Sequence, residues 1–241
     1  MNLLAIETAT EACSVALLHG DALIDRTELA PRRHAELVLP MAEDLLAEAG
    51  IARRQLDAIA VGQGPGAFTG VRLAISVAQG LALALDIPVI PVSSLAALAM
   101  QAPSNGAAIL AAIDARREEI YAGAFRFDAG GLVKALDRER VLPPSALILA
   151  EAEAWNVLGT GWSAYGDAIR EHLPSTPRWA DGDRYPQARD VALLAAPLFA
   201  AGKGMPPEQA LPVYLRDKVA LTLQEQQDER TGNAVQERAG T

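Results

Sequence analysis

The order of short apolar runs in the first hundred residues limits the folds open to this chain. Three apolar runs come first, and because tight turns separate them, each is expected to be a strand. A helical pattern follows, and from there helices and strands alternate. The expected strands are 3–6, 13–18, a run that starts at 23, 57–61 and 88–92, and the expected helices are 33–49, 71–85 and 94–101. This order builds a mixed sheet in which two parallel strands extend three meandering ones.

The opening pattern returns after residues 102–106, a segment rich in turn-forming residues. Residues 3–18 can be laid on residues 110–125 without a gap, which brings Glu7 over Asp114. Both copies continue as strand, acid, polar turn and strand, and this shared layout indicates two lobes of one fold. The strand and helix order is that of ribonuclease H-like domains. The sequence therefore predicts an α/β protein with two such lobes.

The second half contains the elements of a smaller, degenerate lobe. The expected elements are strands within 132–142, a helix near 145–152, an apolar run that ends at 159–161 and a helix at 188–201. We predict a first lobe of residues 1–104, a second lobe of residues 106–223 that includes the final helix, and a polar tail, 224–241. Each lobe is expected to hold a mixed five-stranded sheet with flanking helices. The tail lacks an apolar stripe, so we expect it to be disordered.

Composition excludes several classes of protein. The net charge of −9 argues against a chain that grips a nucleic acid backbone alone, because such binding needs clustered cations. One cysteine, Cys13, rules out an internal disulfide and fits a reducing compartment. An acid at Glu7 precedes any cleavable apolar segment, and the most apolar window, 80–100, is broken by an aspartate and two prolines. We expect a soluble cytoplasmic protein without a membrane segment.

A glycine-rich stretch, GQGPGAFTGVR at 62–72, lies between an expected strand and an expected helix, as phosphate-binding loops do. A P-loop needs two glycines five positions apart followed by lysine, and this spacing does not occur here. The spacing of the small residues matches the Rossmann dinucleotide-binding pattern, but the acid that this pattern requires at the end of the next strand is missing. We interpret Gly64, Gly66, Thr69 and Gly70 as loop-forming residues, with Thr69 as the helix N-cap.

The helix expected at 71–85 has apolar residues on two sides. One stripe begins at Val71, and a second, displaced stripe consists of Leu73, Val77, Gly80 and Ala84. One side can pack on its own sheet, while the other needs a covering element of this chain or another protein. The helix before it, which Gly50 closes, raises the same two alternatives for its extra leucines.

Several segments resemble the bacterial TsaB (YeaZ) family. The resemblance covers nearly the whole chain to about residue 223, and GPGAFTGVR is its most specific part. It is carried, in this order, by LLAIETATEACSVAL, HAELVLP, GQGPGAFTGVRLAISVAQGLA, DARREEIYAG and PVYLRDKVA. It implies a two-lobed actin/Hsp70-like fold. It also implies a non-catalytic subunit in the formation of threonylcarbamoyladenosine on tRNA, at the adenosine next to the anticodon.

The resemblance further implies the partners. The catalytic subunit TsaD is expected to bind through the first two helices of the first lobe, and the ATPase TsaE is expected to join the assembly. Contact with tRNA is expected to be indirect, and the same surface can serve a homodimer when the chain is alone. The candidate partner-binding residues are His34, Leu37, Met41, Arg72, Leu73, Ser76, Val77 and Gly80.

Catalytic and metal-binding groups are missing from the sequence. The TsaD family holds a metal with an H-x-x-x-H pair, whereas His34 is followed four positions later by Val38. We predict no metal site, no catalytic residue and no cofactor. Thr8 and Thr10 keep the small hydroxyl character of a nucleotide-binding hairpin, so a weak or interface-shared contact with ATP or ADP stays open. The second hairpin, with bulky Arg116 and Arg117, is poorly suited to hydrolysis.

Two competing readings remain. One is an active enzyme of the same superfamily, either a small-molecule kinase or an M22-type metallopeptidase. The other is a self-contained homodimeric binding module that uses the same apolar helix faces.

Overall fold

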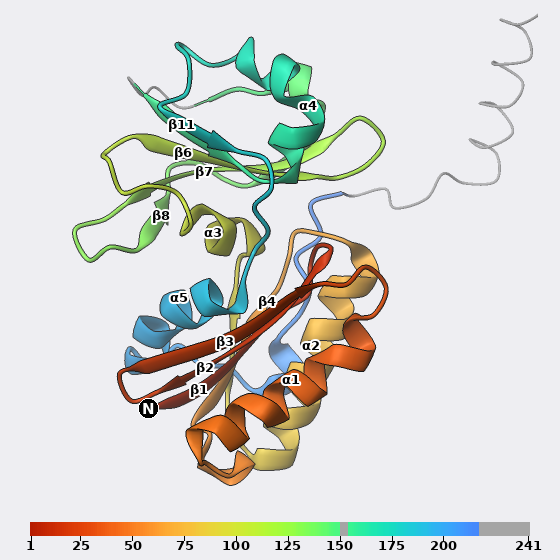
Figure 1. Ribbon diagram of the computed structural model, residues 1–241, viewed down its shortest axis with the longest axis vertical. Helices are drawn as coiled ribbons and strands as arrows, with labels where there is room; N and C mark the ends of the chain where they lie inside the picture. The colour runs from red at the N-terminus through yellow and green to blue at the C-terminus, as the bar shows by residue number, and fades with distance from the viewer. Residues whose placement is uncertain (150–153, 217–241) are drawn as a thin grey trace, which may run out of the picture.

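Five strands from the first hundred residues form one mixed sheet in the computed structural model, which describes residues 1–149 and 154–216. The strands lie in the order β3-β2-β1-β4-β5 (Figure 1). Their bounds are β1 Asn2–Glu7, β2 Ala12–His19, β3 Ala22–Leu29, β4 Ala58–Gly62 and β5 Val89–Val92. The first three strands pair antiparallel, and β4 and β5 add in parallel. The sheet predicted for the first lobe is confirmed.

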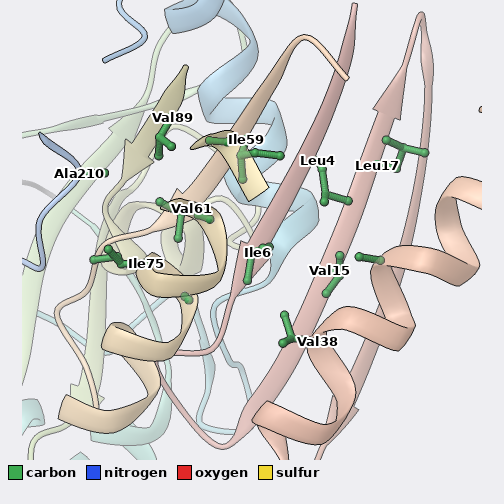
Figure 2. Packing of buried hydrophobic residues seen from close by; sticks show 14 of the residues in the cluster. Leu4, Ile6, Val15, Leu17, Val38, Ile59, Val61, Ile75, Val89 and Ala210 are labelled. Atoms are coloured by element: carbon green, nitrogen blue, oxygen red, sulfur yellow. The ribbon is translucent and has the colours of Figure 1, made fainter. Parts of the chain in front are cut away.

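Helices cover both faces of this sheet. Helices α1, His34–Ala49, and α2, Phe68–Leu85, lie on one face, and α5, Ala188–Ala200, lies on the other (Figure 1). Gly50, with φ +66°, caps α1 as predicted. Successive strand residues point to opposite faces, so one set of apolar side chains meets α1 and α2 and the alternate set meets α5. Figure 2 shows the first set, which includes Leu4, Ile6, Val15, Val38 and Ile75.

The second sheet contains six strands, one more than predicted. Its order is β11-β10-β6-β7-β8, and β9 also pairs with β7. The bounds are β6 Ala108–Asp114, β7 Ile120–Phe127, β8 Val133–Ala135, β9 Arg140–Leu142, β10 Trp155–Leu158 and β11 Trp179–Asp181. The extra strand arises because β8 and β9 pair with different stretches of the same long strand, β7. The two-lobed α/β architecture is confirmed.

Two helices pack across the division between the lobes. Helix α3, Ser94–Ala99, precedes the turn-rich segment but buries Leu95 and Leu98 against the second sheet. Helix α5 follows the second sheet in the chain but buries Val191 and Ala195 against the first. The boundary between 1–104 and 106–223 stays a prediction, since each lobe takes a helix from the other stretch of chain.

Two sequence-based helix predictions need correction. Helix α2 begins at Phe68 with Ala67 as its N-cap, so Thr69 is a first-turn residue and not the cap. The helix predicted near 145–152 is wrong for its described part. A short 3-10 helix, η2, spans Pro144–Ala146 after Pro143, and the chain from 147 to 149 is not helical. Residues 150–152 of that prediction lie outside the described residues.

Helix α4, Thr160–Arg170, was not predicted. Its sequence contains two glycines, which lower helix propensity, so the pattern reads as a loop. Gly161 is needed at this position because a Cβ there would lie 2.9 Å from the Cβ of Ala112. The predicted tail, 224–241, and residues 217–223 lie outside the described residues.

Candidate functional site

The glycine-rich loop is filled by the turn between β1 and β2. The amide of Ala67 donates a hydrogen bond of 2.7 Å to the carbonyl oxygen of Ala9. A Cβ on Gly66 would lie 2.4 Å from that same oxygen, and a Cβ on Gly70 would lie 2.0 Å from the carbonyl oxygen of Thr8. Glycine at these positions therefore permits close approach of two backbones, and the loop is not an open phosphate cradle.

The four loop-forming candidates divide between the loop and the helix. Gly64, with φ +92°, and Gly66 lie in the loop, whereas Thr69 and Gly70 belong to the first turn of α2. The small residues thus fix where α2 begins and how tightly it packs against β1 and β2.

The acid that ends β1 is sealed inside the protein. Glu7 is fully buried, accepting hydrogen bonds from the Ala9 amide at 2.6 Å and the Ser94 hydroxyl at 2.7 Å. Burial raises the pKa of this carboxyl, although the hydrogen bonds oppose the shift. A Cβ on Gly62 would lie 1.9 Å from Glu7 Oε2, so the backbone at Gly62 packs directly against the Glu7 carboxyl. Glu7 is consequently an internal structural acid.

The two candidate nucleotide-binding threonines differ in position. Thr8 is fully buried, and its hydroxyl donates a hydrogen bond of 2.7 Å to the carbonyl oxygen of Gly70. Thr10 is also buried but lines the cleft between the lobes, and its hydroxyl has no hydrogen-bond partner among the described residues. Only Thr10 is placed where a ligand in the cleft could lie near it.

The cleft itself holds a cavity of about 250 Å³. It lies between the β1–β2 turn and the β6–β7 turn, and the C-terminal segment 213–216 closes one side. Arg116 Nη2 reaches Glu11 Oε1 at 3.1 Å, and its Nη1 lies 3.3 Å from Asp114 Oδ2. Arg216 pairs with Glu119 and also bonds the carbonyl oxygen of Ala115. These arginines and acids pair within the chain, so a phosphate group would have to displace an existing ion pair.

Metal-binding and nucleophilic groups do not gather at this cleft. Within residues 1–149 and 154–216, no group of three or more His, Cys, Asp or Glu side chains could hold a metal ion. His34 Nε2 donates a hydrogen bond of 2.9 Å to the carbonyl oxygen of Thr10, which accounts for one ring nitrogen. Cys13 is buried, and burial raises its pKa to about 11, so its thiol is a poor nucleophile.

The outer face of α2 is a second candidate site. The inner stripe of this helix is buried on the first sheet, whereas the opposite stripe is exposed or half-buried. Arg72, Ser76 and Gly80 are exposed, and apart from its chain neighbours and the backbone of its own helix, no described atom lies within 4 Å of a Cβ built on Gly80. Leu83 on the same side is 73% exposed. The described residues of this chain therefore cover the second stripe only in part, since Leu73 and Val77 are half-buried whereas Gly80 and Ala84 are exposed.

The remaining partner-binding candidates lie closer to the core. Leu73 and Val77 on α2 and Leu37 and Met41 on α1 are half-buried, and all but Leu73 pack against the first core cluster. A groove of about 150 Å³, lined mainly by apolar residues, runs between the two helices, with Leu39, Leu46, Leu81 and Leu85 in its lining. We call the exposed sides of α1 and α2, with this groove between them, the α1–α2 surface.

Helix α2 is also long and apolar enough, by length and composition alone, to cross a membrane. A third of it is buried in the fold, and a core helix of a soluble protein passes the same test. Its buried inner stripe accounts for part of its apolar character.

Comparisons with known proteins show which family the chain belongs to. A family model described as TsaD, tRNA N6-adenosine threonylcarbamoyltransferase, matches residues 26–221. The tRNA threonylcarbamoyladenosine biosynthesis protein TsaB of Escherichia coli strain K12 is 42% identical, over 91% of this chain and 96% of that protein. The TsaB of Haemophilus influenzae is 38% identical over 91% and 95% of the two chains. The chain belongs to the TsaB family. The resemblance stated from the sequence is confirmed.

Solved structures of the TsaB (YeaZ) family have the same fold. YeaZ from Pseudomonas aeruginosa is 47% identical with a TM-score of 0.82, and 89% of this chain covers 99% of that one. A second structure from that organism, 48% identical with the same TM-score and coverage, is described as an uncharacterized protein with similarity to peptidase YeaZ.

Two residues of the exposed surface were missed by sequence reasoning. Phe68 and Tyr214 both contact Arg72, at the edge of the cleft. Phe68 could have been found, because it stands four residues before Arg72 on the same helix face. Tyr214 lies 142 residues away from Arg72, and no local pattern links the two.

Proposed function

We propose that this TsaB-family chain is a non-catalytic subunit in tRNA threonylcarbamoyladenosine biosynthesis. Its relatives are named for this pathway. In this proposal the chain binds a TsaD-type threonylcarbamoyltransferase through the α1–α2 surface and activates it. The observation that carries the proposal is the outer face of α2, which is exposed and almost uncharged. A face of this kind favours contact with another protein.

The cleft favours a role in which this chain catalyses no reaction itself. Its arginines and acids neutralise one another, and Glu7, which ends β1, is sealed from the cavity. Metal chemistry needs several convergent ligands, and the described residues offer no group of three or more His, Cys, Asp or Glu side chains that could hold an ion. The acids that line the cavity, Glu11 and Asp114, are both engaged by Arg116. In this proposal the cleft holds no resident cofactor. At most it binds ATP or ADP weakly, or shares such a nucleotide with a partner at their interface.

The further partners follow from the same proposal. The ATPase TsaE joins the assembly through the complex, and tRNA is contacted mainly by the other subunits, since this chain carries a net charge of −9. The site of action is the cytoplasm.

Reconstitution tests this function. The reaction contains the threonylcarbamoyltransferase and the ATPase from the same organism, threonylcarbamoyl-AMP and tRNA, with and without this chain. Modified adenosine is expected only in the complete mixture. Equal product in its absence, or tight salt-sensitive binding of tRNA by this chain alone, would contradict the proposed division of labour.

A homodimeric module is the second candidate, because the exposed stripe of α2 can also meet a second copy of itself. Sedimentation of the chain alone and with the transferase separates the two. A homodimer that persists when the transferase is added favours the second candidate.

A further inference from the structure

Helix α2 has one ionisable residue in 18, Arg72, and it lies near the N-terminal end. The helix dipole makes this end positive, so a cation there gains nothing from the helix itself. No ion pair joins Arg72 to a carboxylate within residues 1–149 and 154–216. Neither the helix nor an ion pair in this part of the chain accounts for an arginine at this position.

Two aromatic rings hold the Arg72 side chain in place. Its guanidinium carbon lies 3.6 Å from the centre of the Phe68 ring and 5.6 Å from that of Tyr214. Arg72 Nε donates a hydrogen bond of 2.6 Å to the Tyr214 hydroxyl. The two rings lie 5.8 Å apart at 30° to each other. We call Phe68, Arg72 and Tyr214 the arginine clamp.

The clamp leaves one side of the guanidinium free to bind. Within the described residues, Nε is the only Arg72 nitrogen with a hydrogen-bond partner, so the two terminal nitrogens keep their donors. Those donors have the fork geometry that matches a carboxylate. Because the rings restrict the side chain before binding, less conformational entropy is lost when it binds.

The clamp is continuous with the α1–α2 surface. Arg72, Ser76 and Gly80 follow one another at intervals of four residues, so they lie along one face of α2. Phe68 and Tyr214 are each 44% exposed, which is high for large aromatic side chains. A partner that covers the outer face of α2 would also cover the guanidinium.

We propose that Arg72 determines specificity at this surface by forming an ion pair with a carboxylate of the partner protein. The inference rests on the proposed function and names the chemistry that the transferase must supply. Burying an unpaired guanidinium at an interface is costly, so an apolar partner without an acid is disfavoured. A nucleic acid backbone is a poorer match, because it needs several cations and α2 has one.

The test measures the affinity of the full chain for the threonylcarbamoyltransferase of the same organism. Titration calorimetry at about 50 mM and about 500 mM salt separates the electrostatic part of binding, which salt screens. Arg72→Met should weaken binding by roughly 5- to 30-fold and flatten the salt dependence. Arg72→Lys keeps the charge but loses the fork, so an intermediate affinity is expected. Tyr214→Phe keeps the ring and loses one hydrogen bond, so its loss should be smaller.

Arg170→Met is the matched control. Arg170 also lies over an aromatic ring, 5.2 Å from the centre of Trp162, but on α4 in the second lobe. This variant should bind with wild-type affinity and salt dependence.

The outcomes separate the inference from the function on which it rests. If the wild type binds and Gly80→Leu weakens binding, while Arg72→Met keeps both affinity and salt dependence, the ion pair is overturned and the α1–α2 surface stands. If the wild type does not bind the transferase, both the proposed function and the ion pair are overturned. Melting temperatures are measured for every variant, and Arg72→Gln replaces Arg72→Met if the latter unfolds.

Discussion

Arg116 in the second lobe and Glu11 in the first form an ion pair across the cleft, with 3.1 Å between Nη2 and Oε1. The two residues are 105 positions apart, so folding alone brings them together. Their side chains are 75% and 40% exposed, and solvent therefore screens the attraction. The pair links the lobes at the mouth of the cavity. It should therefore affect the distance between the lobes more than the free energy of unfolding.

Glu11→Gln should therefore loosen the cleft without unfolding the protein. The free energy of unfolding is expected to fall by no more than about 1 kcal/mol, because exposed ion pairs stabilise by that much or less. The distance distribution between spin labels on the two lobes should broaden. Labelling at introduced cysteines is practical because Cys13 is buried and weakly reactive. Glu43→Gln, which breaks a pair with Arg53 inside the first lobe, is the control. An unchanged distribution in Glu11→Gln would contradict this role.

Asp190 on α5 should make stability depend on pH. Burial raises its pKa from 3.8 to about 7, against the opposing effects of Arg189 and a hydrogen bond with Gln101, while Asp25 adds to the rise. Between pH 4 and 7 the folded state keeps a proton that the unfolded state releases. Stability should therefore fall as pH rises through this window, by an amount on the order of 1–4 kcal/mol.

Asp190→Asn removes this titration and keeps the shape of the side chain. Its free energy of unfolding should change less between about pH 5 and about pH 8 than that of the wild type. Denaturant unfolding at the two pH values measures the difference. Asp44→Asn, at an exposed position on α1, is the control. Equal pH dependence in the wild type and Asp190→Asn would place the titrating group elsewhere.

Replacing two glycines of α2 by alanine should change the stability of the protein in opposite directions. A Cβ on Gly70 would lie 2.0 Å from the carbonyl oxygen of Thr8, so Gly70→Ala must displace backbone and should lower the melting temperature clearly. A Cβ on Gly80 meets no described atom within 4 Å, so Gly80→Ala should stabilise by roughly 0.5–1 kcal/mol through helix propensity. Thermal unfolding of the two variants side by side makes the comparison. Equal destabilisation in both would mean that the outer face of α2 is covered in the isolated chain.

The sequence predicts the first lobe well because local signals and tertiary packing agree there. The turns between β1, β2 and β3 are short, and the apolar periods of α1 and α2 match the faces that they bury. In the second lobe the signals conflict. The two glycines of α4 lower its helix propensity, so its sequence pattern does not indicate a helix. Pro143 precedes, and Pro144 begins, a 3-10 turn that takes the place of the expected helix.

The candidate sites also differ in how far the sequence predicts them. The apolar outer stripe of α2 can be read from periodicity, since it depends on one helix. The arginine clamp and the Arg116–Glu11 pair depend on contacts between distant parts of the chain, which no local pattern encodes. Whether Thr8 or Thr10 faces the cleft also depends on the sheet register and on how closely α2 approaches the β1–β2 turn.

Gly80→Leu should separate binding from folding at the α1–α2 surface. A leucine there projects into open space in the isolated chain, so the melting temperature should stay at or above the wild-type value. In the complex the same side chain would stand where a partner helix approaches closely, and affinity for the transferase should fall by roughly tenfold or more.

Val77→Asp is the contrasting variant. Val77 packs against the core as well as facing outward, so an aspartate there should weaken both stability and binding. Ala164→Leu, at an exposed position on α4, controls for a bulky side chain on any helix surface. Wild-type affinity in a well-folded Gly80→Leu protein would move the interface away from this part of α2 and towards Leu37 and Met41 on α1.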